Sequence, residues 1–188
     1  MSVLRTRFCG ELGIDYRIWS AGFGGADPEL VTAVSGAGGF GVLGANGLPA
    51  NAITALMART RALTDRPFGL NLIIGEADQA DRGALLTAEV QAAADAKVAA
   101  VVLFWGNPAP YVPVAHAGGV KVLLQVGSVA EAQAAAGVDA VIAQGMEAGG
   151  HVRSGGRKTS RTSSGSGSTA GRPGSRPISS PPTTSRIG

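Results

Sequence analysis

The 188-residue sequence is 45% hydrophobic and 15% charged, with a formal net charge of +3, which is the composition of an ordinary soluble domain. The charge is divided unevenly, because residues 152–188 hold seven of the 16 basic residues and none of the 13 acidic ones. Since we expect that basic segment to lack a folded face, the charge does not indicate a nucleic-acid or membrane partner.

The amino-terminal residues lack the features of a targeting segment. Arg5, Arg7 and Glu11 interrupt Met1–Leu12, so this stretch has no continuous apolar core of a signal peptide. No apolar run approaches the ~20 residues of a membrane helix. The single cysteine, Cys9, has no second thiol for a disulfide or a metal motif. We therefore expect a cytoplasmic protein without a metal site.

Six short apolar runs predict buried β-strands. Val98–Phe104 is apolar at successive positions, so neither face of that strand can meet water. Helix-like stretches separate the runs, which is typical of parallel strands joined by crossover helices. This pattern fits either a doubly wound sheet or a (βα) barrel. The predicted strands are Tyr16–Ala21, Phe40–Leu43, Phe68–Ile73, Ala99–Phe104, Lys121–Val126 and Asp139–Ala143.

Two connecting stretches carry clear helix signals. Residues 27–29 (Asp-Pro-Glu) supply a capping side chain, a preset φ and an acid that complements the helix dipole. Ser128 and Glu131 form a capping box, and Ala130–Ala136 is strong helix-forming sequence that ends before Gly137.

The segment Gly36–Gly41 matches the pattern GxGxxG. A dinucleotide-binding fingerprint follows a strand and opens a helix, whereas these glycines follow a predicted helix and precede a strand. We therefore interpret them as a tight turn between helix and strand.

Two features at predicted strands are candidates for a site. Ala21–Gly25 follows the first strand, where barrel enzymes place their sites and where small residues let the backbone approach a ring or a phosphate. A plain glycine-rich turn is the alternative. Asn71 interrupts the apolar third strand, and its amide must find partners if it is buried. A satisfied core amide is the alternative there.

The stretch Gln144–His151 places an amide, a carboxylate, paired glycines and an imidazole directly after the sixth strand. An imidazole titrates near neutrality, so His151 is a candidate base for a carbon-bound proton. A solvated histidine is the alternative, and it is our interpretation of His116. Glu147 either orients His151 or faces water, and we favour the second.

Beyond His151 the alternating pattern stops, and Ser, Gly, Arg, Thr and Pro dominate. Such a segment cannot bury enough apolar surface to offset its ordering entropy. We therefore expect a folded domain at residues 1–151 and a disordered basic tail at residues 152–188. The acid-free composition is typical of an out-of-frame reading of a GC-rich gene, and we hypothesise a frameshift just after His151 or Arg153. Resequencing that finds an uninterrupted frame would exclude this.

Several segments between residues 14 and 151 resemble the nitronate monooxygenases, formerly called 2-nitropropane dioxygenases, which are FMN-dependent barrels. The last segment is the most specific, because few barrels carry QGxEAGGH after a strand. The segments are Ala21–Gly25, Ala33–Gly41, Arg66–Asn71, Lys121–Leu123 with Ser128–Ala132, and Ala143–His151.

The resemblance implies an α/β fold of the (βα)8 TIM-barrel type with an FMN site. It implies oxidation of alkyl nitronates or nitroalkanes by FMN and dioxygen. By this resemblance, the backbone of Ala21, Gly22 and Phe23 would lie against the isoalloxazine ring. Asn71, Gln144 and Gly149 would contact FMN. His151 would be the catalytic base.

The resemblance covers about six βα units and stops before the last two, whose loops often hold phosphate in such barrels. We therefore expect a truncated barrel with two open edges and weak or absent activity. FMN-dependent enoyl-acyl-carrier-protein reductases share the EAGGH-type loop and are one alternative. A non-catalytic fragment is the other. The family usually has Ala-Pro-Met where this chain has Ala21-Gly22-Phe23. The oligomeric state is left open.

Overall fold

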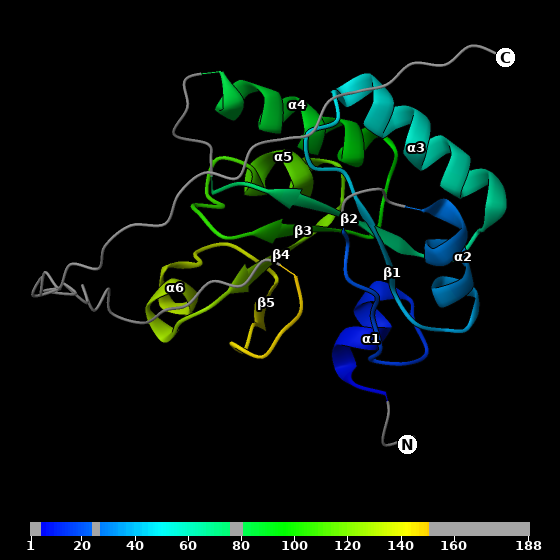
Figure 1. The fold of residues 1–188 in the computed structure, drawn as a ribbon, viewed down its shortest axis with the longest axis horizontal. Coiled ribbons are helices and arrows are strands. Elements are labelled where there is room, and N and C mark those ends of the chain that lie inside the picture. Colours follow the sequence, from blue (N-terminus) through cyan, green and yellow to red (C-terminus); the bar gives the residue numbers. More distant parts are fainter. Residues whose placement is uncertain (1–4, 24–26, 76–80, 151–188) are drawn as a thin grey trace, which may run out of the picture. The chain divides into compact units, whose positions relative to one another are not determined.

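The computed structural model describes residues 5–23, 27–75 and 81–150, all within the first of the two units into which the chain divides, Met1–Gly156. Five parallel strands form one sheet (Figure 1). They are β1 (Gly41–Gly44), β2 (Phe68–Ile73), β3 (Ala100–Phe104), β4 (Lys121–Val126) and β5 (Ala140–Ala143). The helices are α1 (Arg7–Leu12), α2 (Pro28–Gly36), α3 (Ala50–Leu63), α4 (Arg82–Asp95), α5 (Val112–Ala117) and α6 (Val129–Ala134). The predictions for His151 and for residues 152–188 lie outside the described residues.

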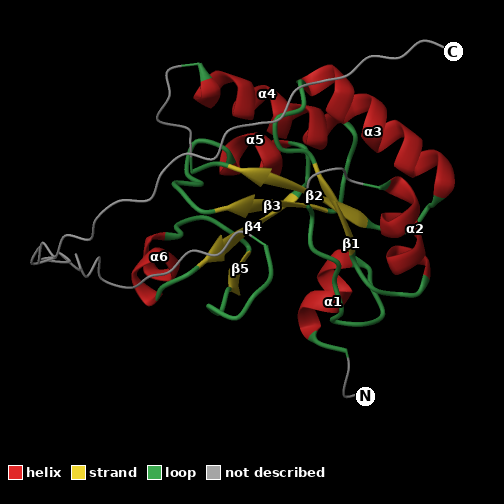
Figure 2. Cartoon of the chain, in the orientation of Figure 1, coloured by secondary structure: helices red, strands yellow, loops and turns green. Residues whose placement is uncertain are grey.

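The strand order distinguishes a barrel from a doubly wound sheet. Each strand pairs in parallel with the next strand along the chain, giving the order β1-β2-β3-β4-β5. A doubly wound sheet reverses its order at a switch point, whereas barrel strands follow the chain. Residues of α2, α3, α4 and α5 pack in one cluster against the same face of the sheet (Figure 2). The predicted α/β fold of the (βα)-barrel type is therefore confirmed.

The first predicted strand, Tyr16–Ala21, is wrong as a strand, so the described sheet has five strands rather than six. This segment makes a single parallel bridge, between Trp19 and Phe40. The pairing ends because the chain then crosses the end of β1. A Cβ atom on Gly22 would lie 2.8 Å from the carbonyl oxygen of Leu43.

The other strand predictions are confirmed within one residue. The bounds of β2 and β4 are those predicted. The strand β1 is shifted by one residue, and β3 and β5 each begin one residue later than predicted. Apolar runs thus located all five described strands to within one residue at either end.

The helix signals act largely as predicted. The carboxylate of Asp27 accepts a hydrogen bond of 2.9 Å from the N–H of Glu29 at the start of α2. At α6, the hydroxyl of Ser128 accepts a hydrogen bond from the N–H of Glu131, and the Glu131 carboxylate accepts one from the N–H of Gly127. The helix ends at Ala134, two residues earlier than predicted.

The predicted turn at Gly36–Gly41 is confirmed. The helix α2 ends at Gly36 and β1 begins at Gly41. Gly38 has a φ of +90°, which favours glycine. A Cβ atom on Gly41 would lie 2.3 Å from the carbonyl oxygen of Val31, so glycine also permits the close approach of helix and strand.

The two faces of the sheet carry separate cores, because successive strand residues point to opposite faces. The outer core joins the sheet to the helices and contains Leu43, Leu70, Leu72, Val101, Leu103, Val122 and Leu124 together with Val31, Ile53, Met57, Leu86 and Ala115. The inner core joins Phe40, Val42, Ala100, Val102 and Leu123 to Cys9, Leu12 and Ile14. Residues of α1 and its carboxyl end therefore close the inner face at the amino ends of the strands, leaving the carboxyl ends for a site.

Candidate functional site

A cavity of about 790 Å³ lies at the carboxyl ends of the strands. Ligand sites in proteins typically enclose about 300–1,000 Å³, so this cavity has the size of a cofactor site. Its walls come from the loop after the first segment, from strand ends and from the stretch after β5. They are formed by Trp19, Ser20, Ala21, Gly22, Phe23, Val42, Asn46, Asn71, Ile73, Val102, Phe104, Gln125, Ile142, Ala143, Gln144, Gly145, Ala148, Gly149 and Gly150.

The six residues expected to bind a cofactor all line this cavity. They come from three distant stretches of the sequence, and the fold brings them together. They are Ala21, Gly22, Phe23, Asn71, Gln144 and Gly149. The predicted base, His151, lies outside the described residues, although the preceding Gly150 belongs to the cavity wall. Whether the six residues contact a cofactor stays a prediction.

The loop at residues 21–23 passes very close to the strand ends. A Cβ atom on Gly22 would lie 2.5 Å from the Cβ of Asn71, and one on Gly44 would lie 2.1 Å from the carbonyl oxygen of Phe23. Real Cβ atoms do not approach other atoms so closely, so both positions require glycine. The Phe23 side chain is 56% exposed. The glycines therefore lay the loop backbone flat along one wall of the cavity.

Amides supply the main polar groups of the cavity. Asn71 is 7% exposed, and its amide nitrogen donates a hydrogen bond of 2.9 Å to the carbonyl oxygen of Val102. The amide oxygen of Asn46 accepts from the N–H of Ile73. Gln125 and Gln144 also line the cavity. Among its described lining residues none is charged, so the cavity suits an uncharged ring with hydrogen-bonding groups.

Sequence reasoning missed two of these amides. Asn46 follows the strand at Phe40–Leu43 and precedes Gly47, and a polar residue just beyond a buried strand was a usable signal. Gln125 carried a weaker signal, because it lies within a run that reads as a continuous strand. Only the alternation of faces along β4 distinguishes it from its outward-facing neighbours Leu124 and Val126.

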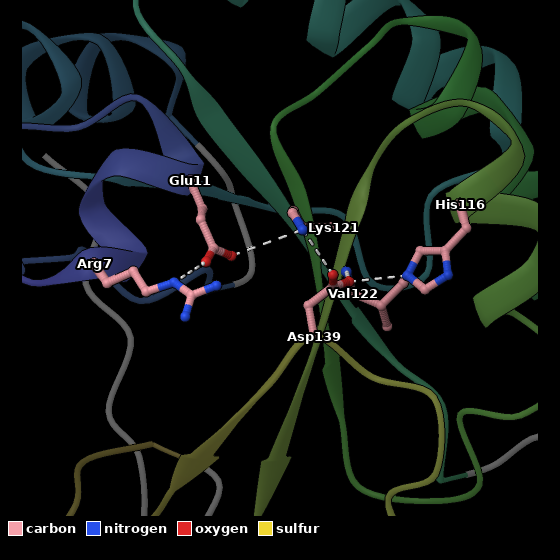
Figure 3. Close-up of polar contacts among 6 residues, drawn as sticks. All are labelled: Arg7, Glu11, His116, Lys121, Val122 and Asp139. Atoms are coloured by element: carbon pink, nitrogen blue, oxygen red, sulfur yellow. Dashed lines mark hydrogen bonds and ion pairs between the residues drawn. The ribbon is translucent and has the colours of Figure 1, made fainter.

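A network of charged groups lies at the opposite end of the sheet, where β4 and β5 begin (Figure 3). The Asp139 carboxylate accepts hydrogen bonds from the N–H of Val122 at 2.8 Å and from Lys121 Nζ at 2.9 Å. It also pairs with His116 Nε2 at 2.9 Å. Glu11 of α1 lies 3.8 Å from Lys121 Nζ. His116 is therefore not merely solvated, which corrects the sequence-based interpretation.

The pKa values within this network are shifted by those contacts. Burial alone would raise the pKa of Asp139, but the hydrogen bonds from Val122, Lys121 and His116 outweigh it and hold that pKa below its ordinary value. The hydrogen bond to Asp139 raises the pKa of Lys121. The network therefore joins the start of β5 to β4 and α5, and through Lys121 to Glu11 of α1.

No group of three or more His, Cys, Asp or Glu side chains within the described residues is arranged to hold a metal ion. None of their helices is both long and apolar enough to cross a membrane. A second cavity of about 380 Å³ lies beside α1 and β5, and it contains none of the predicted site residues.

The chain is similar to several known proteins. Residues 5–166 match the family described as nitronate monooxygenase. A nitronate monooxygenase of Pseudomonas aeruginosa is 34% identical over 180 residues, covering 77% of this chain and 51% of that protein. An octahydroindene carboxyl-CoA dehydrogenase of Rhodococcus jostii is 33% identical over 155 residues, covering 81% of this chain and 42% of that protein.

Among solved structures, FabK from Thermotoga maritima superimposes with a TM-score of 0.70 at 35% sequence identity. The alignment covers 80% of this chain and 47% of that one. The chain therefore spans about half the length of the proteins it matches.

Proposed function

The chain belongs to the nitronate monooxygenase family, and from that premise we propose that its uncharged cavity holds the isoalloxazine ring of FMN. We further infer that the reaction is the oxidation of an alkyl nitronate or nitroalkane with dioxygen. FMN, when bound, supplies the chemistry by accepting electrons from the organic substrate. The protein supplies binding, orientation and a proton acceptor.

The observation that supports this proposal most is the gathering of Ala21, Gly22, Phe23, Asn71, Gln144 and Gly149 along one cavity. Oxidised isoalloxazine is an uncharged aromatic ring with amide-like donors and acceptors, and the described lining is likewise uncharged and rich in amides. The close approach of Gly22 to Asn71 leaves no room for a side chain, so the loop presents only its backbone beside the strand ends. The residues present therefore fit the group.

Some residues of the cavity would bind the flavin ring, and contacts within the protein would fix the orientation of those residues. Asn71, Gln144 and Gly149 would bind the ring, and the backbone of residues 21–23 would pack against it. Because Asn71 already donates to Val102, its orientation is set before any ligand arrives. This arrangement lowers the entropic cost of binding.

The proton acceptor in this proposal is His151. Its imidazole would take the α-carbon proton of a neutral nitroalkane. A nitronate has already lost that proton and needs no base. The two substrates therefore separate the role of His151 from the roles of the residues that hold the cofactor.

A second candidate function is the reduction of an enoyl thioester. The similarity to FabK at 35% identity favours it. A reductase would consume NADH with an enoyl thioester, whereas a monooxygenase would consume dioxygen with propionate 3-nitronate. The two reactions therefore differ in both substrates.

The test uses the purified 188-residue chain. FMN fluorescence should be quenched at micromolar protein, and the FMN-loaded protein should consume oxygen with propionate 3-nitronate. The variant His151→Asn should lose about 10²- to 10⁴-fold in kcat/KM with a neutral nitroalkane and little with the nitronate. The variant Asp95→Asn, on an exposed end of α4, serves as the control.

Three results would contradict the proposal. A chain that leaves FMN fluorescence unchanged is a non-catalytic fragment. Consumption of NADH with an enoyl thioester, in place of oxygen with the nitronate, assigns the reductase function. Equal losses with both substrates in His151→Asn would remove the histidine from the proton step.

A further inference from the structure

Gln125 occupies a distinctive position in the sheet. The register aligns Ile73 with Phe104, Phe104 with Gln125, and Gln125 with Ile142. These four residues form one inward-facing layer at the carboxyl ends of the strands, and all four line the cavity. Gln125 therefore brings one carboxamide into a layer whose other side chains are apolar.

The amides of the cavity differ in how far their hydrogen-bonding groups are already used. The oxygen of Asn46 accepts from Ile73, and the nitrogen of Asn71 donates to Val102. Gln144 has an interaction of its own within the protein. The half-buried side chain of Gln125 has no hydrogen-bond partner in the part of the chain that the structure describes.

A half-buried carboxamide on an apolar wall has a strong preference for a partner. Its neighbours in the layer, Phe104 and Ile142, cannot supply one, and a polar group withdrawn from water without a hydrogen bond is costly. A bound ligand that excludes water from this layer must therefore satisfy Gln125 or lose affinity. This requirement selects ligands by the chemistry of the edge that they present.

We propose that Gln125 is a ligand-contacting specificity residue that pairs with the pyrimidine edge of the isoalloxazine ring. This inference rests on the proposed function. The pyrimidine edge carries an N3–H donor between two carbonyl acceptors, and a carboxamide offers an acceptor oxygen beside a donor nitrogen. The Gln125 oxygen accepts from N3–H while its nitrogen donates to an adjacent ring carbonyl. The apolar neighbours keep water away from both bonds.

The test compares riboflavin with N3-methylriboflavin. Both lack the phosphate of FMN, and they differ only in that the methylated flavin lacks the N3–H donor. Dissociation constants come from quenching of flavin fluorescence by the full 188-residue chain. In the unchanged protein, N3-methylation should weaken binding about 10- to 100-fold, because it removes the N3–H bond and its methyl group displaces the Gln125 nitrogen from the neighbouring carbonyl. The Gln125→Met variant should bind riboflavin about as weakly as the unchanged protein binds N3-methylriboflavin. In this variant, N3-methylation should lower the affinity by less than about twofold.

The matched control is Gln133→Met, the same substitution on an exposed position of α6. It should keep both the affinity for riboflavin and the full penalty for N3-methylation. Circular dichroism and a thermal melt report whether each variant is folded. If Gln125→Met does not fold, Gln125→Leu replaces it, because leucine is of similar size and has neither a donor nor an acceptor for the ring edge.

The outcomes separate this inference from the proposed function. An equal N3-methylation penalty in the unchanged protein and in the Gln125 variant overturns the inference and leaves flavin binding intact. An unchanged protein that binds neither flavin overturns the proposed function and the inference with it. A penalty confined to proteins that retain Gln125 supports both.

Discussion

The two ends of the parallel sheet are built from different chemistry. At the amino end, Lys121 and His116 both pair with the carboxylate of Asp139. At the carboxyl end, the cavity is lined by glycines, apolar side chains and amides without a charged group among the described residues. The same strand, β4, begins at Lys121 and reaches Gln125 near its other end. From this contrast we expect substitutions at the amino end to change mainly stability and substitutions at the carboxyl end to change mainly ligand binding.

The strongest way to break this comparison is the substitution Asp139→Ala. It removes three hydrogen bonds at once and leaves the N–H of Val122 without its partner. The free energy of unfolding should fall by about 2–4 kcal/mol. Chemical denaturation followed by circular dichroism measures this change. Flavin affinity per folded molecule should stay within about twofold, since the residue is remote from the cavity.

Asp95→Ala is the matched control for this experiment. Asp95 is exposed at the end of α4 and accepts a hydrogen bond from Gln91, so its loss should cost less than about 0.5 kcal/mol. A comparable cost for both variants would contradict the role assigned to the charged network. A large loss of flavin affinity in folded Asp139→Ala would contradict the separation of the two ends.

The second prediction concerns the carboxyl end. In Gly22→Ala, the new methyl group would lie 2.5 Å from the Cβ of Asn71, so the loop must move out of its place. Flavin affinity should fall at least about tenfold, while overpacking costs about 1–3 kcal/mol of stability. Fluorescence quenching and chemical denaturation measure the two effects separately.

The control for this substitution is Gly36→Ala at the end of α2, where an added Cβ atom meets nothing within 4 Å. Because alanine favours the helix, stability should be unchanged or higher by up to about 1 kcal/mol. Undiminished flavin binding by Gly22→Ala would show that the loop is not a wall of the ligand site.

The third and smallest prediction concerns how the stability that Asp139 contributes at the amino end depends on pH. The folded-state pKa of Asp139 lies below its unfolded value of about 3.9, so its ionised form stabilises the fold above that pH. This contribution is lost as the pH falls through the folded-state pKa. The stability difference between the unchanged protein and Asp139→Asn should therefore shrink from pH 6 to pH 3. Denaturation curves across this range measure it, and a constant difference would contradict the assignment.

The sequence predicted those parts of the molecule that local pattern determines. The apolar runs at β2 and β4 gave correct bounds, because buried parallel strands require apolar residues on both faces. The Asp27 cap and the turn at Gly38 were also predicted, because capping and a positive φ depend on neighbouring residues. The residues predicted to bind a cofactor came from resemblance to a family, and the six of them that the structure describes line one cavity.

What the sequence did not reveal depends on contacts between distant elements. His116 and Asp139 are separated by 22 intervening residues, and no local pattern marks them as partners. The Tyr16–Ala21 run is apolar enough for a strand, yet the close approach of Gly22 to Asn71 turns the chain across the sheet. Gln125 became distinctive only once the register placed it between Phe104 and Ile142.

The inward-facing layer at positions 73, 104, 125 and 142 has a practical consequence for engineering. Its members alternate with the outward-facing residues that hold the helices, so they can be varied without touching that packing. A combinatorial library confined to these four codons would explore new ligand preferences on an unchanged scaffold. Because Phe104 is itself buried, substitutions at this position are the ones whose folding needs checking before selection on binding.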